Sequence, residues 1–335
     1  MDATARSGDD EAVKAYVCKR SGSDGYAEID NVAEPKAGAG ELVVDARAMS
    51  ANFPDMLQVK GLYQQIPSTP FVLGMEYAGI VASVGEGVAN FAVGDRVAGM
   101  TQGAFAERVW TPEWTCYPLP ETIDFEQGAC LTLAGGTALY ALKYRGTLQP
   151  GETLAVLGAS GGTGSLAVQV GRALGARVIA ICSNTEKAEV AGNAGAHEVI
   201  DLSNEDLSDA LKSHTDNRGV DVLYDPVGGE AFSAACRRIA WNGRILTVGY
   251  AAGTIPDLPI NLPLIKGYSL VGVHWAAAVV KESALAKRIV AELFALAEKG
   301  AVTAHVDSRW RLDDASAALE KMSDRKVIGK LVLKA

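Results

Sequence analysis

A glycine-rich turn between an apolar β-branched run and an apolar helical run most constrains how this 335-residue chain folds. The turn reads Gly-Ala-Ser-Gly-Gly-Thr-Gly over residues 158–164. It follows a predicted strand at 153–157 and opens a predicted helix at 165–174. Glycines allow a tight turn, and the helix start offers unpaired N–H groups to a pyrophosphate. The context predicts a dinucleotide site built on Ser160, Gly161, Gly162, Thr163 and Gly164.

One position departs from the usual G-x-G-x-x-G pattern of such sites. Ala159 holds the first glycine position, whereas Gly161 and Gly164 hold the second and third. The strand and helix on either side of the turn nevertheless support the prediction.

Short β-branched runs alternate with helical runs after the turn. Predicted strands lie at 153–157, 177–181, 198–200, 220–224, 244–248 and 269–273. Predicted helices between them lie at 165–174, 186–194, 206–214 and 230–240. This alternation is typical of a parallel sheet that helices cover on both faces. Two helices at 282–299 and 313–322 and a strand at 329–333 follow.

The first third of the chain has a different pattern, with short β-prone runs and glycine turns over residues 41–117. Such spacing predicts an irregular β-barrel or sandwich. A chain of this length, with 48% hydrophobic residues, exceeds what one core usually organises, so we expect two domains. The polar residues 1–11 are expected to form a disordered tail without a secretory signal.

Charge and hydropathy narrow the possible partners. The net charge of -9 makes a nucleic-acid partner unlikely, since polyanions attract basic surfaces. No apolar run is long enough to span a bilayer, so we expect no membrane association and a cytoplasmic protein. The five cysteines and four histidines show no paired ligand spacing, so no metal site is predicted.

The end of the second predicted strand bears on the choice of dinucleotide. NAD-binding folds usually carry an acidic residue there, but this chain has Cys182, Ser183 and Asn184. A 2′-phosphate could bond Ser183 and pair with Lys187, which favours NADPH. Alternatively, Lys187 is a solvated helix charge beside Glu186 and Glu189.

Several segments resemble the medium-chain dehydrogenase/reductase superfamily, specifically its zinc-independent quinone oxidoreductase branch, the zeta-crystallin-like proteins. They are Asn52-Phe53-Pro54-Asp55, Gly61-Leu62-Tyr63, residues 74–79, 93–97 and 148–152, and the glycine turn. The resemblance implies an α/β fold with a GroES-like β-barrel substrate domain, residues 12–135 and 277–335. It also implies a Rossmann-like doubly wound parallel sheet at 136–276 that binds NADPH, and a homodimer built through that domain.

The chain departs from the zinc-dependent relatives at two ligand positions. Those relatives carry a cysteine where this chain has Asn52, and a histidine where it has Met75. An amide and a thioether do not replace a thiolate and an imidazole as Zn²⁺ ligands. We therefore expect hydride transfer, without metal, to a small electrophile such as a quinone or an α,β-unsaturated carbonyl compound.

Two residues match candidate catalytic positions of the family. Asn52 matches an asparagine at the nicotinamide end of the cleft, and Tyr63 matches the tyrosine that enoyl thioester reductases use as a proton donor. Tyr63 could instead be a packed aromatic beside a loop. Many quinone reductases carry a further tyrosine where this chain has Leu57, a departure that weakens the quinone assignment.

Other residues match cofactor positions through the resemblance. Thr137 matches a threonine beside the nicotinamide, although it could be a helix-packing residue. Gly249, His274 and Trp275 follow predicted strands and are expected to line the nicotinamide pocket, with a satisfied loop histidine as the alternative for His274. Lys330 matches a segment at the cofactor edge, or is simply exposed.

Two further hypotheses stay open. An enoyl thioester reductase would need basic residues for the phosphates of acyl-CoA, and Lys60, Lys143 and Arg145 are candidates. A hypothesis of another class is a non-catalytic NADPH-binding or RNA-associated protein, against which the acidic charge counts.

Overall fold

The computed structural model describes residues 12–335, so the tail predicted at residues 1–11 lies outside the described part. The described chain forms two compact units, residues 12–133 with 306–335, and residues 134–305. Sequence analysis assigned 277–305 to the first domain, but the structure groups this segment with the second. The reason is that α10 (Ser283–Glu298) packs on α3 (Gly136–Leu139) and α9 (Trp275–Lys281).

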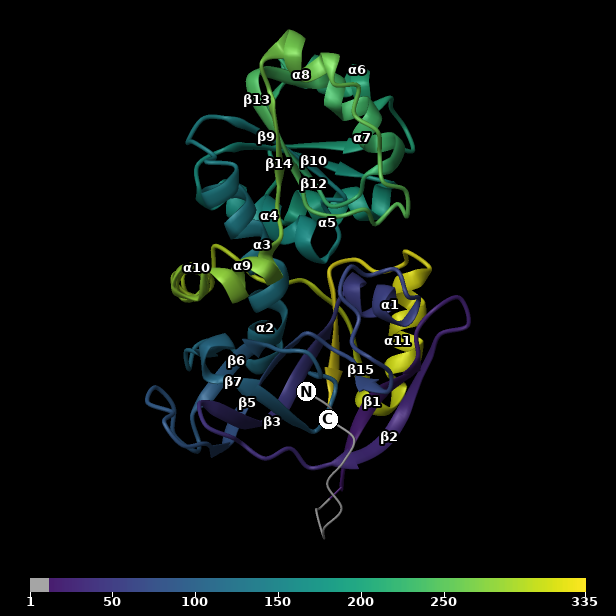
Figure 1. Ribbon diagram of the computed structural model, residues 1–335. Coiled ribbons are helices and arrows are strands. Elements are labelled where there is room, and N and C mark those ends of the chain that lie inside the picture. The colour runs from purple at the N-terminus through teal and green to yellow at the C-terminus, as the bar shows by residue number, and fades with distance from the viewer. Residues whose placement is uncertain (1–11) are drawn as a thin grey trace. The chain divides into compact units, whose positions relative to one another are not determined.

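The second unit contains a six-stranded parallel sheet (Figure 1). Its order is β11-β10-β9-β12-β13-β14, so the chain starts in the middle, fills one side and then crosses to the other. This is the doubly wound order with its switch point between β9 and β12. The strands are β9 (Thr153–Leu157), β10 (Arg177–Cys182), β11 (Glu198–Asp201), β12 (Val220–Asp225), β13 (Ile239–Thr247) and β14 (Ser269–Gly272).

Both faces of this sheet are covered, which explains why its strands are apolar throughout. Leu157 and Ile181 face a core that includes side chains of α6 (Leu207–His214) and α7 (Gly229–Ala235). On the other face, Gly171 of α4 (Gly162–Ala173) lies so close that a Cβ there would approach Leu154 to 2.5 Å. A parallel sheet buried on both sides requires this continuous hydrophobic pattern.

The predicted strands and helices of this unit agree with the structure, apart from their ends. The largest difference is β13, predicted from residue 244 but beginning at Ile239, where a register shift interrupts its pairing with β12. The remaining helices of the unit are α5 (Thr185–Asn193), the 3₁₀ turn η4 (Cys236–Arg238) and α8 (Asn261–Lys266), together with the π-helical η3 (Tyr140–Arg145).

The first unit is built mainly of antiparallel strands. Its larger sheet has the order β15-β16-β3-β5-β6-β8, with β7 also paired to β3, and a second sheet has the order β2-β1-β4. The strands are β1 (Ala12–Arg20), β2 (Tyr26–Ala33), β3 (Glu41–Ala51), β4 (Phe71–Val72), β5 (Glu76–Val84), β6 (Arg96–Met100), β7 (Arg108–Pro112), β8 (Cys116–Pro118), β15 (Val306–Arg311) and β16 (Lys330–Lys334). Both the predicted β-rich first half and the returning final strand are present.

Helices close the first unit around one apolar core. They are α1 (Phe53–Val59), α2 (Phe125–Cys130) and α11 (Ala315–Ser323), with the 3₁₀ turns η1 (Glu113–Thr115) and η5 (Leu312–Asp314) and, next to α2, the π-helical η2 (Leu131–Gly135). Leu42, Tyr77 and Phe105 are fully buried in this core together with Leu331 from β16. Among residues 12–335, no helix is both long and apolar enough to cross a membrane.

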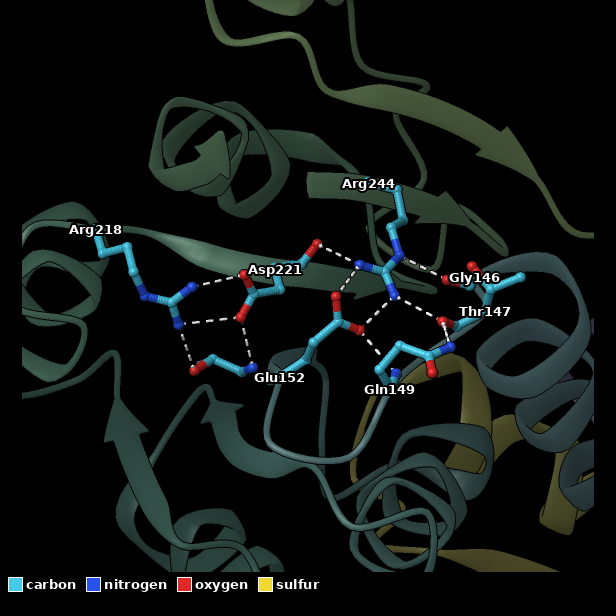
Figure 2. A network of polar contacts seen from close by, with 8 residues as sticks. Gly146, Thr147, Gln149, Glu152, Arg218, Asp221 and Arg244 are labelled. Carbon is cyan, nitrogen blue, oxygen red and sulfur yellow. Dashed lines mark hydrogen bonds and ion pairs between the residues drawn. The ribbon is translucent and has the colours of Figure 1, made fainter. Parts of the chain in front are cut away.

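A network of arginines and carboxylates joins the amino ends of β9 and β12 to the neighbouring strand β13 (Figure 2). Arg244 of β13 donates to both oxygens of Glu152, at 2.6 and 2.5 Å, and its Nε donates to the carbonyl oxygen of Gly146. Arg218 makes the same two-pronged contact with Asp221 of β12, at 2.7 and 3.0 Å. The Thr153 N–H of β9 donates to Asp221 at 2.7 Å and links the two pairs to the central strand.

The opposing effects on the pKa of Glu152 show that this network stabilises the folded protein. Burial raises the pKa of its carboxyl, but hydrogen bonds from Arg244 and from the Gln149 N–H outweigh burial and hold the pKa below its ordinary value. A lowered pKa means that the folded state favours the ionised form. The stabilisation is therefore present above the ordinary carboxyl pKa and is lost as the pH falls through the folded value.

We expect Glu152→Gln to lower the free energy of unfolding by about 1–3 kcal/mol, since it removes charge-assisted hydrogen bonds from a mostly buried arginine. Urea denaturation at pH 7 measures this loss. At acidic pH the difference from the parent should shrink, because protonation removes the same charge. The exposed Glu189→Gln is the control, and an equal effect of both variants would contradict the assignment.

Candidate functional site

The turn after β9 has the tight local geometry that its glycines predict. Gly158 has a φ of +60°, a conformation that favours glycine, and Ala159 beside it is buried with its N–H bonded to the Ile181 carbonyl oxygen. Gly158 therefore supplies the tight turn, one residue before the glycine position that Ala159 occupies. The missing first glycine of the pattern is thus compensated by its neighbour.

The third glycine of the pattern is required by close packing. A Cβ on Gly164 would lie 2.1 Å from the Gly158 carbonyl oxygen, whereas one on Gly161 would lie 3.3 Å from that same oxygen. Gly164 therefore lets helix α4 approach the turn, and at Gly161 a side chain would also be tight, but less so. The first helical hydrogen bond runs from the Ser165 N–H to Gly161, so the N–H groups of residues 162–164 precede the helical ladder. These N–H groups lie at the positive end of the helix, where such groups can bind an anion.

Two side chains of the turn have partners within the protein. The Thr163 hydroxyl lies 2.6 Å from the Tyr224 hydroxyl and donates to the Ala134 carbonyl oxygen at 3.3 Å. Ser160 is buried beside Cys182, where burial raises the pKa of the thiol to about 11 against an opposing hydrogen bond from Ser160. Both side chains anchor the turn, which leaves their backbone as the part that can meet a phosphate.

The end of β10 has the polar surface that sequence analysis predicted. Ser183 is exposed, and Asn184 caps helix α5 by accepting the Lys187 N–H at 3.0 Å. The charge of Lys187 also acts on the Cys182 thiol, which places the ammonium near this strand end. Ser183 and Lys187 are thus on the same edge of the sheet as the glycine turn.

A carboxylate that the sequence patterns did not single out also lies at this edge. Asp201 ends β11 and pairs in register with Cys182. Its oxygens accept from the Thr185 hydroxyl at 2.7 Å, the Ser203 hydroxyl at 2.6 Å and the Asn204 amide at 2.8 Å. The hydrogen bonds from Ser203 and Thr185 lower its pKa. The Asp-x-Ser-Asn pattern after the strand was the available signal of this turn.

The other predicted strand ends meet at the same edge. Gly249 follows β13, and the exposed His274 follows β14 and precedes α9. A second overlooked carboxyl, Asp225, ends β12 and accepts the N–H groups of Val227 and Gly228 at 2.8 Å each. Ligands of open parallel sheets bind outside the carboxyl ends of strands near the switch point, and these residues lie there.

Trp275, which is predicted to line the nicotinamide pocket, is buried in the described structure. It is only 2% exposed and packs on Tyr140 with ring centroids 5.6 Å apart. Gly136 lies so close that a Cβ there would approach the Trp275 Nε1 atom to 2.5 Å. Trp275 therefore holds α9 against α3, in which Thr137 is half-buried.

In the first unit, Asn52, Glu76 and Lys330 form a buried polar cluster. The Lys330 ammonium lies 2.5 Å from the Asn52 Oδ1 atom and 2.7 Å from the Glu76 Oε1 atom. Lys330 is 3% exposed, so the alternative prediction of a simply exposed lysine is wrong. The reason is that Lys330 neutralises a buried glutamate, which a single sequence does not reveal.

The Asn52 side chain is saturated as a donor. Its Nδ2 atom donates to the Ser50 carbonyl oxygen and to Glu76 Oε1, both at 2.9 Å. An amide has two N–H donors, so none is left for a substrate oxygen. Asn52 thus fixes the junction between β3 and α1, and its backbone N–H donates to Asp55 at 2.7 Å.

Tyr63 is half-buried on the loop that follows α1. Burial and the nearby charge of Asp55 both raise the pKa of its hydroxyl. Asp55 itself is fully buried, and this burial raises the pKa of its carboxyl to about 7. Tyr63 therefore stays protonated at neutral pH, as a proton donor must.

Residues 12–335 contain no group of three or more His, Cys, Asp or Glu side chains that could hold a metal ion. The five cysteines are buried and unpaired. Asn52 and Met75 occupy the two positions discussed above, and the Lys330 ammonium already contacts the Asn52 oxygen.

Comparison with known families and proteins gives consistent matches. Residues 38–121 match the alcohol dehydrogenase GroES-like domain, and residues 162–291 match a family described as zinc-binding dehydrogenase. The quinone oxidoreductase of Pseudomonas aeruginosa is 35% identical over 90% of this chain and 92% of its own length. The mouse quinone oxidoreductase-like protein 2 is 34% identical over 91% of this chain and 88% of its own. The Escherichia coli quinone oxidoreductase, solved with NADPH, is 29% identical with a TM-score of 0.89 over 97% and 100% of the two chains.

Proposed function

Since this chain belongs to the quinone oxidoreductase branch of the medium-chain dehydrogenase/reductase superfamily, we propose that it is a zinc-independent, NADPH-dependent reductase. Its acceptor is a quinone or an α,β-unsaturated carbonyl compound. The observation that carries the proposal is the glycine turn at the carboxyl edge of a doubly wound sheet, next to a strand end without a free carboxylate. A screen of quinones, enones and enoyl thioesters by NADPH consumption tests it, and no turnover with any of them would reject it.

The preference for NADPH rests on the end of β10. Ser183 and Lys187 offer a hydroxyl and a positive charge, and the neighbouring Asp201 carboxylate is satisfied by local donors. A carboxylate engaged in this way is not available for the ribose hydroxyls of NADH. Structural relatives bound to NADPH support the same choice.

The buried cluster supports chemistry without zinc. A metal at the Asn52 position would have to bind an amide oxygen that already accepts from an ammonium 2.5 Å away. Two cations that close repel each other strongly in a buried site. When bound, the nicotinamide supplies the hydride, and this chain has to orient the acceptor and supply a proton.

We assign Tyr63 as the side chain that donates the proton to the acceptor. Asn52 has no free N–H, so the nearby phenol is the donor that remains on this segment. Tyr63 retains its proton at neutral pH, because burial and Asp55 raise its pKa.

Acyl-CoA is less favoured as substrate. Lys143 forms an ion pair with Glu292, the Arg145 Nε atom donates to the Gly272 carbonyl oxygen at 3.1 Å, and Lys60 donates to the Ser323 hydroxyl at 3.0 Å. These contacts engage the basic side chains that phosphate recognition would need.

Tyr63→Phe should lower turnover of an unsaturated ketone by about 100-fold or more, the usual contribution of a positioned acid. The affinity for NADPH should hardly change, because the phenol is not a phosphate contact. Steady-state kinetics and fluorescence titration with NADPH measure the two effects. The exposed Tyr26→Phe is the matched control, and unchanged turnover of Tyr63→Phe would make Tyr63 a packing residue.

Lys187→Ala should weaken NADPH binding by about 10-fold, since an ion pair with a phosphate is worth roughly 1.5–3 kcal/mol before solvent screening. NADH lacks the 2′-phosphate, so its affinity should stay the same. Titrations with both dinucleotides provide the comparison, with Lys212→Ala on α6 as control. Equal losses for both would reject the phosphate contact.

We also propose a homodimer that forms through the second unit. Strand β14 is an edge strand, and the segments around it expose large apolar side chains. Trp241 is 71% exposed and Leu264 of α8 is 83% exposed, and Ile260, Ile265 and Leu270 are also exposed. An open strand edge with apolar neighbours is typical of a surface that pairs with a second copy.

Leu264→Asp should shift the protein towards monomers, because it places a charge in the proposed apolar interface. Sedimentation velocity at several concentrations measures the change. Val93→Asp, at an exposed apolar site of the first unit, should leave the assembly as it is. A parent chain that sediments as a monomer would contradict the dimer.

A further inference from the structure

Together with the adjoining Asp55, the buried cluster of the first unit holds two carboxyl groups but one ammonium. Glu76 is well satisfied, because its oxygens accept from Lys330 at 2.7 Å, Asn52 at 2.9 Å, the Leu133 N–H at 2.8 Å and Thr132 at 3.2 Å. Asp55 accepts the Asn52 N–H at its Oδ2 atom. Its Oδ1 atom is buried without a hydrogen-bond partner in the described structure.

This asymmetry determines which carboxyl group carries a proton. An ionised carboxylate with one unpartnered oxygen is costly in a buried site, and here a second anion would also oppose Glu76. Burial raises the pKa of Asp55 to about 7, although the Asn52 N–H and the Lys330 charge oppose this rise. Glu76 therefore pairs with Lys330, and Asp55 is the group that changes its charge near neutral pH.

Asp55 and Tyr63 are close in the chain and are coupled through charge. Asp55 lies in the first turn of α1, and Tyr63 lies on the loop that leaves this helix. The Leu62 N–H donates to the Leu57 carbonyl oxygen at 2.9 Å, which ties the loop to the helix. The charged groups that act on Asp55 are Lys330 and Glu76, and the Asp55 charge makes the neutral Tyr63 a weaker acid.

We propose that Asp55 is a positioning residue that controls proton release from Tyr63 through its own charge. With Asp55 neutral, Tyr63 gives its proton to the acceptor that has received the hydride. With Asp55 ionised, the resulting phenolate would lie near a second anion, so Tyr63 keeps its proton. The inference rests on the proposed role of Tyr63.

The step is balanced without any atom from Asp55. The acceptor gains a hydride at carbon, which bound NADPH would supply as it becomes NADP⁺, and a proton from the Tyr63 hydroxyl, whose O–H bond breaks. The phenolate left behind regains a proton from water. Because Asp55 acts through charge alone, the enzyme should slow as the pH rises through the titration of Asp55.

Asp55→Asn tests the proposal, because its side-chain oxygen still accepts the Asn52 N–H while the charge is removed. In the parent, kcat with an unsaturated ketone should fall several-fold between pH 6 and 8.5, and in Asp55→Asn this fall should be absent. Asp24→Asn, on the exposed turn after β1, should keep the parental fall. The same fall in Asp55→Asn as in the parent would overturn the proposal.

A second measurement follows the titration of Asp55 without an activity assay. A raised folded pKa means that stability from this group is present at acidic pH and is lost as the pH rises through the folded value. The urea midpoint of the parent should therefore fall relative to Asp55→Asn between about pH 4 and 7. A ¹³C NMR titration of the aspartate carboxyls in the parent gives the same information without a variant. Absence of any titration near neutrality would overturn the proposal.

Tyr63→Phe separates this inference from the proposed function. In that background, Asp55→Asn should no longer change the pH profile, because its target is gone. If Tyr63→Phe turns over like the parent, the proposed donor is wrong and this inference falls with it. If Tyr63→Phe is slow but Asp55→Asn keeps the parental profile, the donor stands and the control by Asp55 fails.

Discussion

The contact between the Lys330 ammonium and the Glu76 carboxylate organises the polar interior of the first unit. It joins β16 to β5 across 254 residues of sequence. Through Asn52 it also fixes the end of β3 and the start of α1. Breaking a buried ion pair by removing one partner costs about 3–5 kcal/mol, so this unit tolerates little change there. The position of α1, and with it the loop that carries Tyr63, depends on this pair.

The second unit depends instead on a steric constraint, the approach of α4 to β9. No Cβ fits at Gly164, and the turn at Gly158 needs a positive φ. These two glycines place the first N–H groups of α4 at the carboxyl edge of the sheet, next to the ends of β10 and β12. The hydrogen bond between Thr163 and Tyr224 then ties the helix start to β12. The placement of these N–H groups therefore follows from the packing of α4 on the sheet.

Sequence patterns predicted the local features well, because they come from residues close together in the chain. The strand before the turn was placed at 153–157, where β9 lies, and the doubly wound class agrees with the observed order. Long-range features escaped prediction. Lys330 looked like an exposed residue because its partner Glu76 lies far away in sequence. The burial of Trp275 against Gly136 is likewise a tertiary contact, which the local sequence does not show.

The roles of Asp55, Asp201 and Asp225 escaped prediction for a related reason. Each aspartate lies at a helix start or strand end, where aspartate is common and often only caps a turn. Asp201 does so, since its hydrogen bonds are local. Asp55 differs because strands β5 and β16 surround it with Glu76 and Lys330. An identical Asn-x-x-Asp pattern on an exposed helix would cap it and titrate normally, so the chemistry of Asp55 is determined by the charges that the fold brings to it.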